Sequence, residues 1–515
     1  MVHRVAALAL STLVLGGCAA GPAPCTADAS RLGPLRTRWT RRFGSERDQH
    51  ATAVTTGPDG SIFVGGFFEG ELTAREAGID AGAQPRRPSV ASPDVAVGPP
   101  GPGEALGAGR AEPRSTGPDA AAAASGSDAF VKRMGPDGTS RWTRTFGGAG
   151  SQWINDLAVD AAGNVVAVGL LDGSADLGFG VETSAGDEDI LVVSLDGDGK
   201  SRWSRRVGGP DNQRAHGVAV DAQGNVFVVG ELHGTVTIDG VTLEDTGAGD
   251  VWVVVFAPDG RLRWTRRYGD AGAQIGADVA LDGRGNVFVV AWGDGGVDFG
   301  AGERSAGAST AGFLAKLAPD GRELWSRVVG EHTWVDLGRV YLHGAAATPD
   351  GGLVVGGSFT GRANLGGRTL SAGDHGDAVV AAYDRNGGHV FSSPIGGDAG
   401  GATALSVAPG AGGHVFAAGF FDGTLDLCSG PMPSAGLRDA FVVELDGSGA
   451  FVAGRAFGDE DDQLGQAIAT APGGALALVG FGAGGLPDAT PRRGKPAEPT
   501  DALPDYDAFV TLLSR

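Results

Sequence analysis

Closely spaced carboxylates are the first residues in this sequence that could do chemistry. Asp196 and Asp198 lie in the segment Leu195-Asp-Gly-Asp-Gly199, which suggests a calcium site. A calcium loop, however, takes about six to eight oxygen ligands from a longer alternation of acidic residues. Here a strand pattern follows directly, and corresponding segments read Pro-Asp-Gly. We therefore interpret these carboxylates as turn residues, and the run Asp459-Glu-Asp-Asp462 as a solvated loop.

Other signatures of catalysis are missing from the sequence. The nine histidines are scattered, without a His-x-x-x-His or Glu-x-x-His pair that would indicate a metal centre. There is no Gly-x-Ser-x-Gly elbow and no Walker loop. We therefore predict no catalytic residue, no metal and no cofactor.

A cysteine near the N-terminus points to covalent modification instead. Arg4 precedes an apolar stretch, Val5 to Leu15, that is too short to span a bilayer. The segment Leu15-Gly16-Gly17-Cys18 then resembles a bacterial lipobox, in which small residues admit the signal peptidase and the cysteine becomes the lipidated first residue. A secreted protein without a lipid is the alternative.

The lipobox implies an export pathway and a destination. It implies a signal peptide over residues 1–17, lipidation at Cys18 and a tether over residues 18–34. The residue after the cysteine is Ala19 and not the aspartate of an inner-membrane retention signal. We therefore expect an exported lipoprotein at the outer membrane or cell surface.

Two further cysteines, Cys25 and Cys428, remain after lipidation. An oxidising compartment allows them to form a disulfide, although the sequence alone does not fix the pairing. They are candidates for one disulfide.

The charge limits the possible partners. Lys and Arg number 40 against 61 Asp and Glu, which gives a formal net charge of −21. Such a surface repels phosphate backbones and anionic lipid head groups, which argues against nucleic acid as a partner. Cationic partners, counter-ions and plain solubility remain as explanations, and solubility is the simplest. We expect a monomer whose membrane contact is the lipid.

The elements that would position any site come from an internal repeat. Near copies of one segment begin at four tryptophans spaced 61 residues apart: Trp142, Trp203, Trp264 and Trp325. Phe391 and Phe451 continue the series in a weaker form, and Trp39 stands 103 residues before the first of the four. That larger distance is one repeat plus an insertion of about forty residues, so seven copies result.

Each copy contains four strand-like runs. In the third full copy they are 217–220, 225–230, 250–256 and the strand of Trp264. The runs are short, rich in β-branched residues and separated by glycine and asparagine, as in strands joined by tight turns. Glycine is 92 of 515 residues, and 42% of the chain is hydrophobic, enough for a packed core.

The chain ends favour a closed arrangement. The last copy stops after its third strand, residues 508–513, whereas Leu35 to Gly44 forms an unmatched fourth strand. Placing this N-terminal strand in the last unit completes seven four-stranded units and removes the open edges of a stack. We therefore predict an all-β fold, a seven-bladed β-propeller over residues 35–515.

A family resemblance supports this fold. The core Val-Asp-x-x-Gly-Asn-Val-Phe-Val-x-Gly, followed by a tryptophan strand, resembles bacterial β-propeller repeats of the SBBP type. It is clearest in residues 160–169, 221–230 and 282–291, whereas 471–474 departs from it. The resemblance implies a propeller and an extracytoplasmic setting, but no activity.

Two segments lie outside the repeat. Residues 73–127 are rich in Ala, Gly, Pro and Ser, and 486–506 are a shorter segment of the same kind. Without a periodic apolar face, both are predicted to be disordered inserts between the second and third strands of blades one and seven.

Residues that recur in every copy are interpreted as architectural. Glutamines recur eight residues before a turn: Gln49, Gln152, Gln213, Gln274 and Gln463. We expect them to be hydrogen-bond partners between blades, with a ligand site as the alternative. The repeated tryptophans are expected to pack between neighbouring blades and not to stack on sugars.

Residues that occur only once are better candidates for a binding site. The turns after the first and third strands are short, so variable connections gather on the opposite face, where binding residues concentrate. The candidate binding residues on that face are Trp153, Arg214, His332, Trp334, Asp336 and Asp461.

The sequence favours a membrane-tethered module that binds a protein, a glycan or another envelope component. A polysaccharide hydrolase or lyase is an alternative that needs two carboxyl groups about 5–10 Å apart at the channel mouth. A purely structural envelope protein is a further alternative.

Overall fold

The protein is built almost entirely of β-strands. The computed structural model describes residues 35–44, 47–70, 72, 126–330, 338–373, 375–397, 400–427, 430–483 and 506–515. Apart from a single 3-10 turn at Ala411–Gly413, every element in these ranges is a strand, which confirms the predicted all-β class. The same ranges contain no helix long and apolar enough to cross a membrane.

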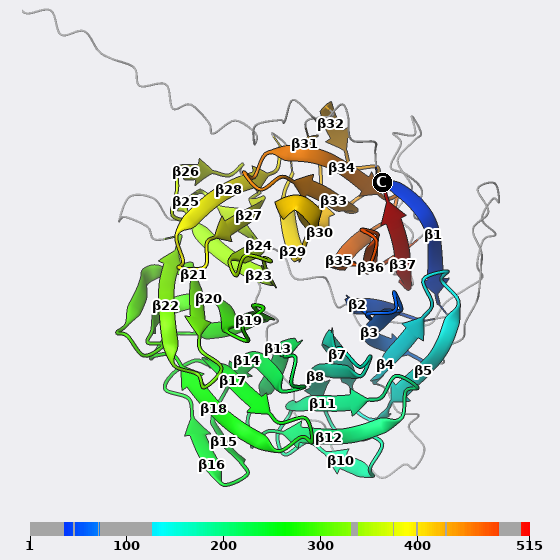
Figure 1. The fold of residues 1–515 in the computed structure, drawn as a ribbon, viewed down its shortest axis with the longest axis vertical. Coiled ribbons are helices and arrows are strands. Elements are labelled where there is room, and N and C mark those ends of the chain that lie inside the picture. Colours follow the sequence, from blue (N-terminus) through cyan, green and yellow to red (C-terminus); the bar gives the residue numbers. More distant parts are fainter. Residues whose placement is uncertain are drawn as a thin grey trace, which may run out of the picture.

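Seven four-stranded antiparallel sheets carry the fold, arranged around a common centre (Figure 1). We number the sheets one to seven in the order of their innermost strands. These innermost strands are β2 (Gln49–Thr56), β7 (Gln152–Val159), β13 (Gln213–Val220), β19 (Gln274–Leu281), β23 (Arg339–Ala347), β29 (Ala402–Pro409) and β35 (Gln463–Thr470). The second strands are β3 (Ile62–Glu69), β8 (Val165–Leu171), β14 (Val226–Leu232), β20 (Val287–Val297), β24 (Leu353–Thr360), β30 (Val415–Phe421) and β36 (Leu476–Gly482).

The outer half of each sheet follows the same order. The third strands are β4 (Ser127–Met134), β11 (Asp189–Leu195), β17 (Asp250–Phe256), β21 (Arg304–Leu317), β27 (Asp377–Tyr383), β33 (Asp439–Leu445) and β37 (Asp507–Ser514). The outermost strands are β5 (Ser140–Phe146), β12 (Ser201–Val207), β18 (Leu262–Tyr268), β22 (Glu323–Val329), β28 (His389–Ile395), β34 (Phe451–Phe457) and, for sheet seven, β1 (Arg36–Phe43). The second and third strands are almost wholly buried, as expected for strands covered on both faces.

Sheet seven combines the two ends of the described chain. β1 pairs antiparallel with β37, from Arg36 opposite Ser514 to Phe43 opposite Ala508. Each innermost strand contacts the innermost strand of the next sheet, and β35 contacts β2 in the same way. Sheet seven therefore touches sheet one through residues more than 400 positions apart.

Two faces of the disc follow from the strand directions. Short turns join the first to the second and the third to the fourth strands, and we name this side the turn face; the other connections lie on the loop face. In the turn of Asp196, its Oδ1 accepts the N–H groups of Asp198 and Lys200, both at 2.9 Å. This is the turn role predicted from the sequence. The described residues contain no cluster of three or more His, Cys, Asp or Glu side chains able to hold a metal ion.

Small hairpins between the second and third strands were not predicted. They are β9 (Ser174–Asp176) with β10 (Val181–Thr183), β15 (Thr235–Ile238) with β16 (Val241–Glu244), β25 (Arg362–Asn364) with β26 (Thr369–Ser371), and β31 (Thr424–Leu427) with β32 (Gly430–Pro433). Val236 and Ile238 pack with Trp203 and Val207 of the preceding sheet. Each such hairpin adds apolar contact between neighbouring sheets.

The paired glycines that end many outermost strands have a steric cause. A Cβ on Gly208 would lie 2.1 Å from Oδ1 of the buried Asp189, and one on Gly209 would lie 2.1 Å from the carbonyl oxygen of Thr235 in the next hairpin. Only glycine admits both close approaches.

The repeated tryptophans lie between sheets, as predicted. Trp142 Nε1 donates to the carbonyl oxygen of Gly197 at 2.9 Å, and Trp203 Nε1 donates to that of Pro258 at 2.9 Å. In both pairs the acceptor lies in the third-to-fourth turn of the following sheet.

Candidate binding site at the centre of the loop face

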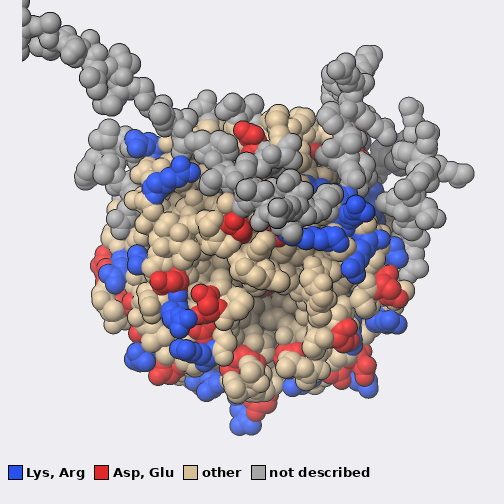
Figure 2. Space-filling model, turned by 45° about the horizontal axis from the view of Figure 1, so that its top comes forward, with Lys and Arg blue, Asp and Glu red and all other residues tan. Residues whose placement is uncertain are grey.

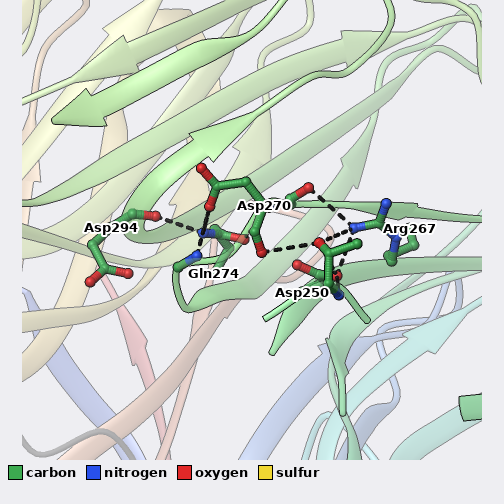
Figure 3. A network of polar contacts seen from close by, with 8 residues as sticks. Asp250, Arg267, Asp270, Gln274 and Asp294 are labelled. Atoms are coloured by element: carbon green, nitrogen blue, oxygen red, sulfur yellow. Dashed lines mark hydrogen bonds and ion pairs between the residues drawn. The ribbon is translucent and has the colours of Figure 1, made fainter. Parts of the chain in front are cut away.

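The repeated glutamines connect neighbouring sheets. Gln274 is fully buried, and its backbone N–H donates to the carbonyl oxygen of Gly249 in the preceding sheet at 2.9 Å. Its side-chain Nε2 donates to Asp294 O at 2.7 Å and to Asp270 Oδ1 at 2.9 Å (Figure 3). At this junction the bond to the preceding sheet thus comes from the backbone of Gln274, whereas its side chain binds its own sheet and the connection between the two sheets.

A buried aspartate beside this glutamine begins the third strand. Asp250 accepts a bond from Arg267 at 2.7 Å and from the backbone N–H of Thr246 at 2.9 Å (Figure 3). Arg206 and Arg42 make the same ion pair in sheets two and seven, to Asp189 and Asp507 respectively. These ion pairs balance charges that burial would otherwise penalise.

Sheets five and six keep the aspartate but lack the arginine. In β28, Pro394 stands where β18 has Arg267, and Asp377 Oδ1 is buried without a hydrogen-bond partner. Burial raises the pKa of Asp377 to about 6, and that of Asp439 to about 6 as well. Both carboxyls therefore favour the protonated form in the fold.

Stability should consequently respond to pH through Asp377. Because the pKa of Asp377 is raised in the fold, binding of a proton by this carboxyl stabilises the folded state. This contribution to the free energy of unfolding is complete below pH 3.8 and is lost as the pH rises through about 6. We expect Asp377→Asn to raise the free energy of unfolding at pH 8 by about 1–2 kcal/mol relative to the wild type. At pH 5 the increase in the free energy of unfolding should be smaller. Urea unfolding at several pH values measures this difference.

The matched control is Asp250→Asn, which breaks the pair with Arg267. It should lower stability by about 3–5 kcal/mol at both pH values, because it leaves a charge without its partner. A gain for Asp377→Asn that does not change between pH 5 and pH 8 would contradict the assignment of this titration.

The sequence-predicted binding residues lie partly within the described ranges. Trp153 is in β7, Arg214 is in β13, and Asp461 is in the connection before β35. The first two are therefore strand residues and not loop residues, because the innermost strands extend further toward the loop face than their apolar runs indicated. His332, Trp334, Asp336, Cys18, Cys25 and Cys428 lie outside the described residues.

Trp153 and Arg214 occupy equivalent positions, each directly after the buried glutamine of its strand. Trp153 Nε1 donates to Ser127 Oγ, which belongs to sheet one. Arg214 forms ion pairs with Glu188 of sheet two and, at 3.2 Å, with Glu231 of its own sheet. The variable position after the glutamine therefore joins neighbouring sheets.

A row of aromatic rings continues from Trp153 across three sheets. Trp153 stacks on Phe67 with ring centroids 4.6 Å apart, and Phe67 stacks on His50 at 4.5 Å. The ring centroid of His50 then lies 3.8 Å from that of Phe481 and 5.8 Å from that of Tyr506. Burial lowers the pKa of His50 to about 4, so the imidazole is neutral at physiological pH. The row is an uncharged aromatic strip.

An ion pair ends the row in sheets six and seven. Tyr506 Oη donates to Asp462 Oδ2 at 3.3 Å, and Asp462 accepts bonds from Arg438 at 2.8 and 3.1 Å. Asp461 itself is half-buried, and burial together with the neighbouring carboxylates raises its pKa. We name the whole series the mouth arc: Arg438, Asp462, Tyr506, Phe481, His50, Phe67, Trp153, Arg214, Glu188 and Glu231.

The sequence assigned to inserts one residue of the arc, Tyr506, and also Ser127, which accepts the bond from Trp153. Ser127 and Tyr506 are the last residues of the segments predicted as disordered, yet Ser127 begins β4 and Tyr506 contacts the ring of His50. The insert predicted over 73–127 therefore overlaps β4 by one residue, whereas β37 begins at Asp507, directly after the insert predicted over 486–506. An aromatic residue just before a strand, as at Tyr506, is the signal that marks this boundary.

The other end of the arc is charged. Burial alone would raise the pKa of Glu231, but His233, His216 and Arg214 outweigh it and lower the pKa to about 2. The same carboxylate raises the pKa of His233, whereas burial lowers the pKa of His216. This end therefore presents the charged carboxylate of Glu231 beside the Arg214 guanidinium.

Two carboxyl groups on the innermost strands were missed by the sequence reasoning. Burial raises the pKa of Asp156 to about 7, and burial and the nearby Asp156 raise the pKa of Asp278 well above its ordinary value. Asp156 Oδ2 accepts the N–H of Val218 at 2.7 Å, and Asp278 Oδ2 accepts that of Ala345 at 2.7 Å. Each carboxyl thus connects its strand to the next sheet.

These carboxyls follow a β-bulge that recurs in every innermost strand, for example between Ile154 and Asp156. A bulge redirects side chains at a strand interior. No sequence signal marks it, because the residues at the bulge differ between copies. Figure 2 shows a hollow near the centre of one face of the disc, lined mainly by residues without charge.

Solved structures with a similar arrangement have very different sequences. Sqt1 from Chaetomium thermophilum shares 11% identity with a TM-score of 0.40, over 87% of this chain and 97% of that chain. A polysaccharide lyase of family PL25, an ulvan lyase, shares 10% identity with a TM-score of 0.38, over 85% and 93%. A gluconolactonase from Xanthomonas campestris shares 13% identity with a TM-score of 0.31, over 70% and 86%. At these TM-scores the similarities assign no activity to the chain.

Sequence comparison gives one family match. No curated protein matches the chain. Residues 263–297, which run from the outermost strand of sheet three into sheet four, match the family described as SBBP, a beta-propeller repeat. The match covers a small part of the chain and supports the predicted repeat family, with a fold of the propeller type.

Proposed function

We propose that the seven sheets are the blades of one closed β-propeller. Support comes from the pairing of β1 with β37, which combines strands from the two ends of the described chain in one sheet. It also comes from the contact of β35 with β2, the innermost strands of sheets seven and one. A closed ring leaves no sheet without a neighbour and gives a rigid frame for a site.

The propeller is proposed to be exported and anchored to the outer membrane or cell surface by a lipid on Cys18. The support is the sequence Leu15-Gly16-Gly17-Cys18 after a short apolar stretch. A disulfide between Cys25 and Cys428 belongs to the same proposal, because export places both thiols in an oxidising compartment.

The proposed function is binding of an envelope glycan or protein at the mouth arc. One observation carries it: rings from three adjacent sheets form a continuous row from Trp153 to Tyr506. Such a row offers apolar contact area in a rigid setting, and the ion pairs at its ends offer hydrogen-bonding groups that fix orientation. Sugars and extended peptides both combine apolar faces with polar edges.

Affinity capture from envelope extracts tests this function, with the mature chain carrying Cys18→Ser as bait. A specific component should bind, and Trp153→Ala should weaken its binding by about fivefold or more, because truncation of an aromatic contact residue that matters for binding costs more than about 1 kcal/mol. The matched control is Thr403→Ala, at the equivalent position of β29 but outside the arc. Equal binding by the wild type and Trp153→Ala would refute this site.

A polysaccharide hydrolase or lyase is the second candidate, and Asp156 with Asp278 is the observation that favours it. Burial raises the pKa of both carboxyls, which would let one of them hold a proton and act as a general acid. Activity on envelope polysaccharides that both Asp156→Asn and Asp278→Asn abolish, with folding intact, would support this role. A purely structural protein would show neither activity nor a saturable ligand.

A further inference from the structure

Charge is distributed unevenly over the turn face. Sheets one to five have an acidic residue in both of their short turns, and sheet six has one in its second turn. These residues are Asp59, Asp137, Asp160, Asp196, Asp221, Asp259, Asp282, Asp320, Asp350, Asp384 and Asp446. Among the described residues, the one turn of sheet seven, 471–475, contains no acidic residue. The acidic turn residues therefore lie in sheets one to six, some of them beside a basic residue such as Arg261 or Arg322, and the described turn of sheet seven has none.

The outermost strand of sheet seven is instead basic. β1 reads Arg-Thr-Arg-Trp-Thr-Arg-Arg-Phe and contains no acidic residue. Arg42 is paired with Asp507, and Arg41 donates to the carbonyl oxygen of Gly138. The side chains of Arg36 and Arg38 are exposed, and no side-chain hydrogen bond or ion pair joins either to another residue of the described part. Figure 2 shows Lys and Arg side chains gathered on the side of the disc where β1 lies.

Equivalent arginines elsewhere have acidic neighbours. Arg38 lies at a β-bulge just before Trp39, and Arg141, Arg202 and Arg263 have the same place in sheets one to three. A charge and a bulge on an outer strand also prevent edge-to-edge pairing, which explains the recurrence. In sheets one to three, however, each arginine follows a turn with an aspartate, as Asp259 precedes Arg263. In sheet seven no such turn precedes Arg38 within the described residues, because its outermost strand is β1.

The N-terminal segment joins the disc at this basic end. Leu35 is buried, and its carbonyl oxygen accepts a bond from Arg455 Nη1 at 3.0 Å, so the start of β1 is fixed to sheet six. β1 begins on the turn face, because it runs antiparallel to β37. An anchor on the N-terminal segment would therefore be connected to the disc at Arg36 and Arg38.

From this arrangement we propose that Arg36 and Arg38 contact the anionic phospholipid head groups of the membrane, and thereby hold the edge of sheet seven toward the bilayer. The acidic turns of the other sheets face away from the anionic surface in this orientation, and the loop face with the mouth arc stays accessible. The inference rests on the proposed lipid anchor for its tether. Each exposed arginine beside an anionic surface strengthens binding to that surface by about fivefold, and two such arginines suffice to orient an anchored disc.

Arginine reactivity on vesicles tests the orientation. The chain from residue 19 onward, with an N-terminal hexahistidine tag, is held on vesicles that contain nickel-chelating lipid in either phosphatidylcholine alone or phosphatidylcholine mixed with phosphatidylglycerol. Phenylglyoxal modification is then followed residue by residue with mass spectrometry. Arg36 and Arg38 should react about fivefold more slowly on the phosphatidylglycerol vesicles, and added salt should restore their rates.

Arg263 is the internal control, since it has the same bulge position in sheet three and should react equally on both kinds of vesicle. Equal rates for Arg36 and Arg38 on both vesicles would overturn the proposal. The lipid anchor is tested separately, by whether Cys18→Ser releases the exported chain from membranes. Because the vesicle experiment uses an artificial tether, failure of the anchor and failure of the orientation give different results.

Discussion

Removal of residues 1–44 should abolish the stable fold, whereas removal of residues 1–34 should leave it intact. The longer deletion removes β1, whose pairing with β37 extends along the whole strand. It also removes Phe43, which is 6% exposed, and the bond from Trp39 Nε1 to the carbonyl oxygen of Pro136 in sheet one. The decrease in the free energy of unfolding should approach the whole stability of a typical domain, which is about 5–15 kcal/mol.

The physical reason is the edge that would be left. Without β1, the backbone groups of β37 lose their partners, and the buried side chains of Val510 and Leu512 lose their cover. Asp507 also loses its ion pair with Arg42. A sheet with such an edge is expected to associate with other chains.

Urea unfolding followed by tryptophan fluorescence, together with size-exclusion chromatography, compares the two deletions. The 1–34 deletion serves as the control, because it retains every described residue. If both deletions unfold at the same urea concentration as monomers, then β1 does not close the propeller, and the closed arrangement is wrong.

The repeat made the strands and the all-β class predictable. Apolar runs such as 250–256 coincide with β17, because a strand buried on both faces has a continuous apolar sequence. The first strands are less apolar at their loop-face ends, so β13 begins at Gln213, four residues before the run at Gly217. That difference placed Trp153 and Arg214 on loops in the sequence reasoning.

The mouth arc could be predicted only in part. Trp153 and Arg214 stood out because they differ between copies, but the stacking of Phe67 on His50 depends on pairing between strands that no spacing reveals. The hairpins had a signal that was overlooked: Asp239-Gly240 between alternating apolar residues is typical of a two-residue turn, and both residues have positive φ. The carboxyls of Asp156 and Asp278 come together only because bulges recur in strands of unlike sequence.

Substitution of the glycine at the end of the outermost strand should destabilise the protein as much as substitution of a core residue. A Cβ on Gly269 would lie 2.0 Å from Oδ1 of Asp250 and 2.3 Å from Oε1 of Gln274. Neither partner can move freely, since both are fully buried and hydrogen-bonded. We expect Gly269→Ala to lower the free energy of unfolding by about 3 kcal/mol or more, through overpacking and the loss of buried hydrogen bonds.

Gly283→Ala is the matched control, because a Cβ at Gly283 meets no atom within 4 Å and its φ is not positive. It should change stability by less than about 1 kcal/mol, and reduced freedom of the unfolded chain can even make it stabilising. Asp250→Ala removes the nearer of the two obstacles, so adding Gly269→Ala to that variant should cost less than it does in the wild type. Thermal or urea unfolding of the four variants measures this coupling. If Gly269→Ala costs the same with and without Asp250, the recurrence of glycine at this position is not due to the buried aspartate, and the steric account of the repeat is refuted.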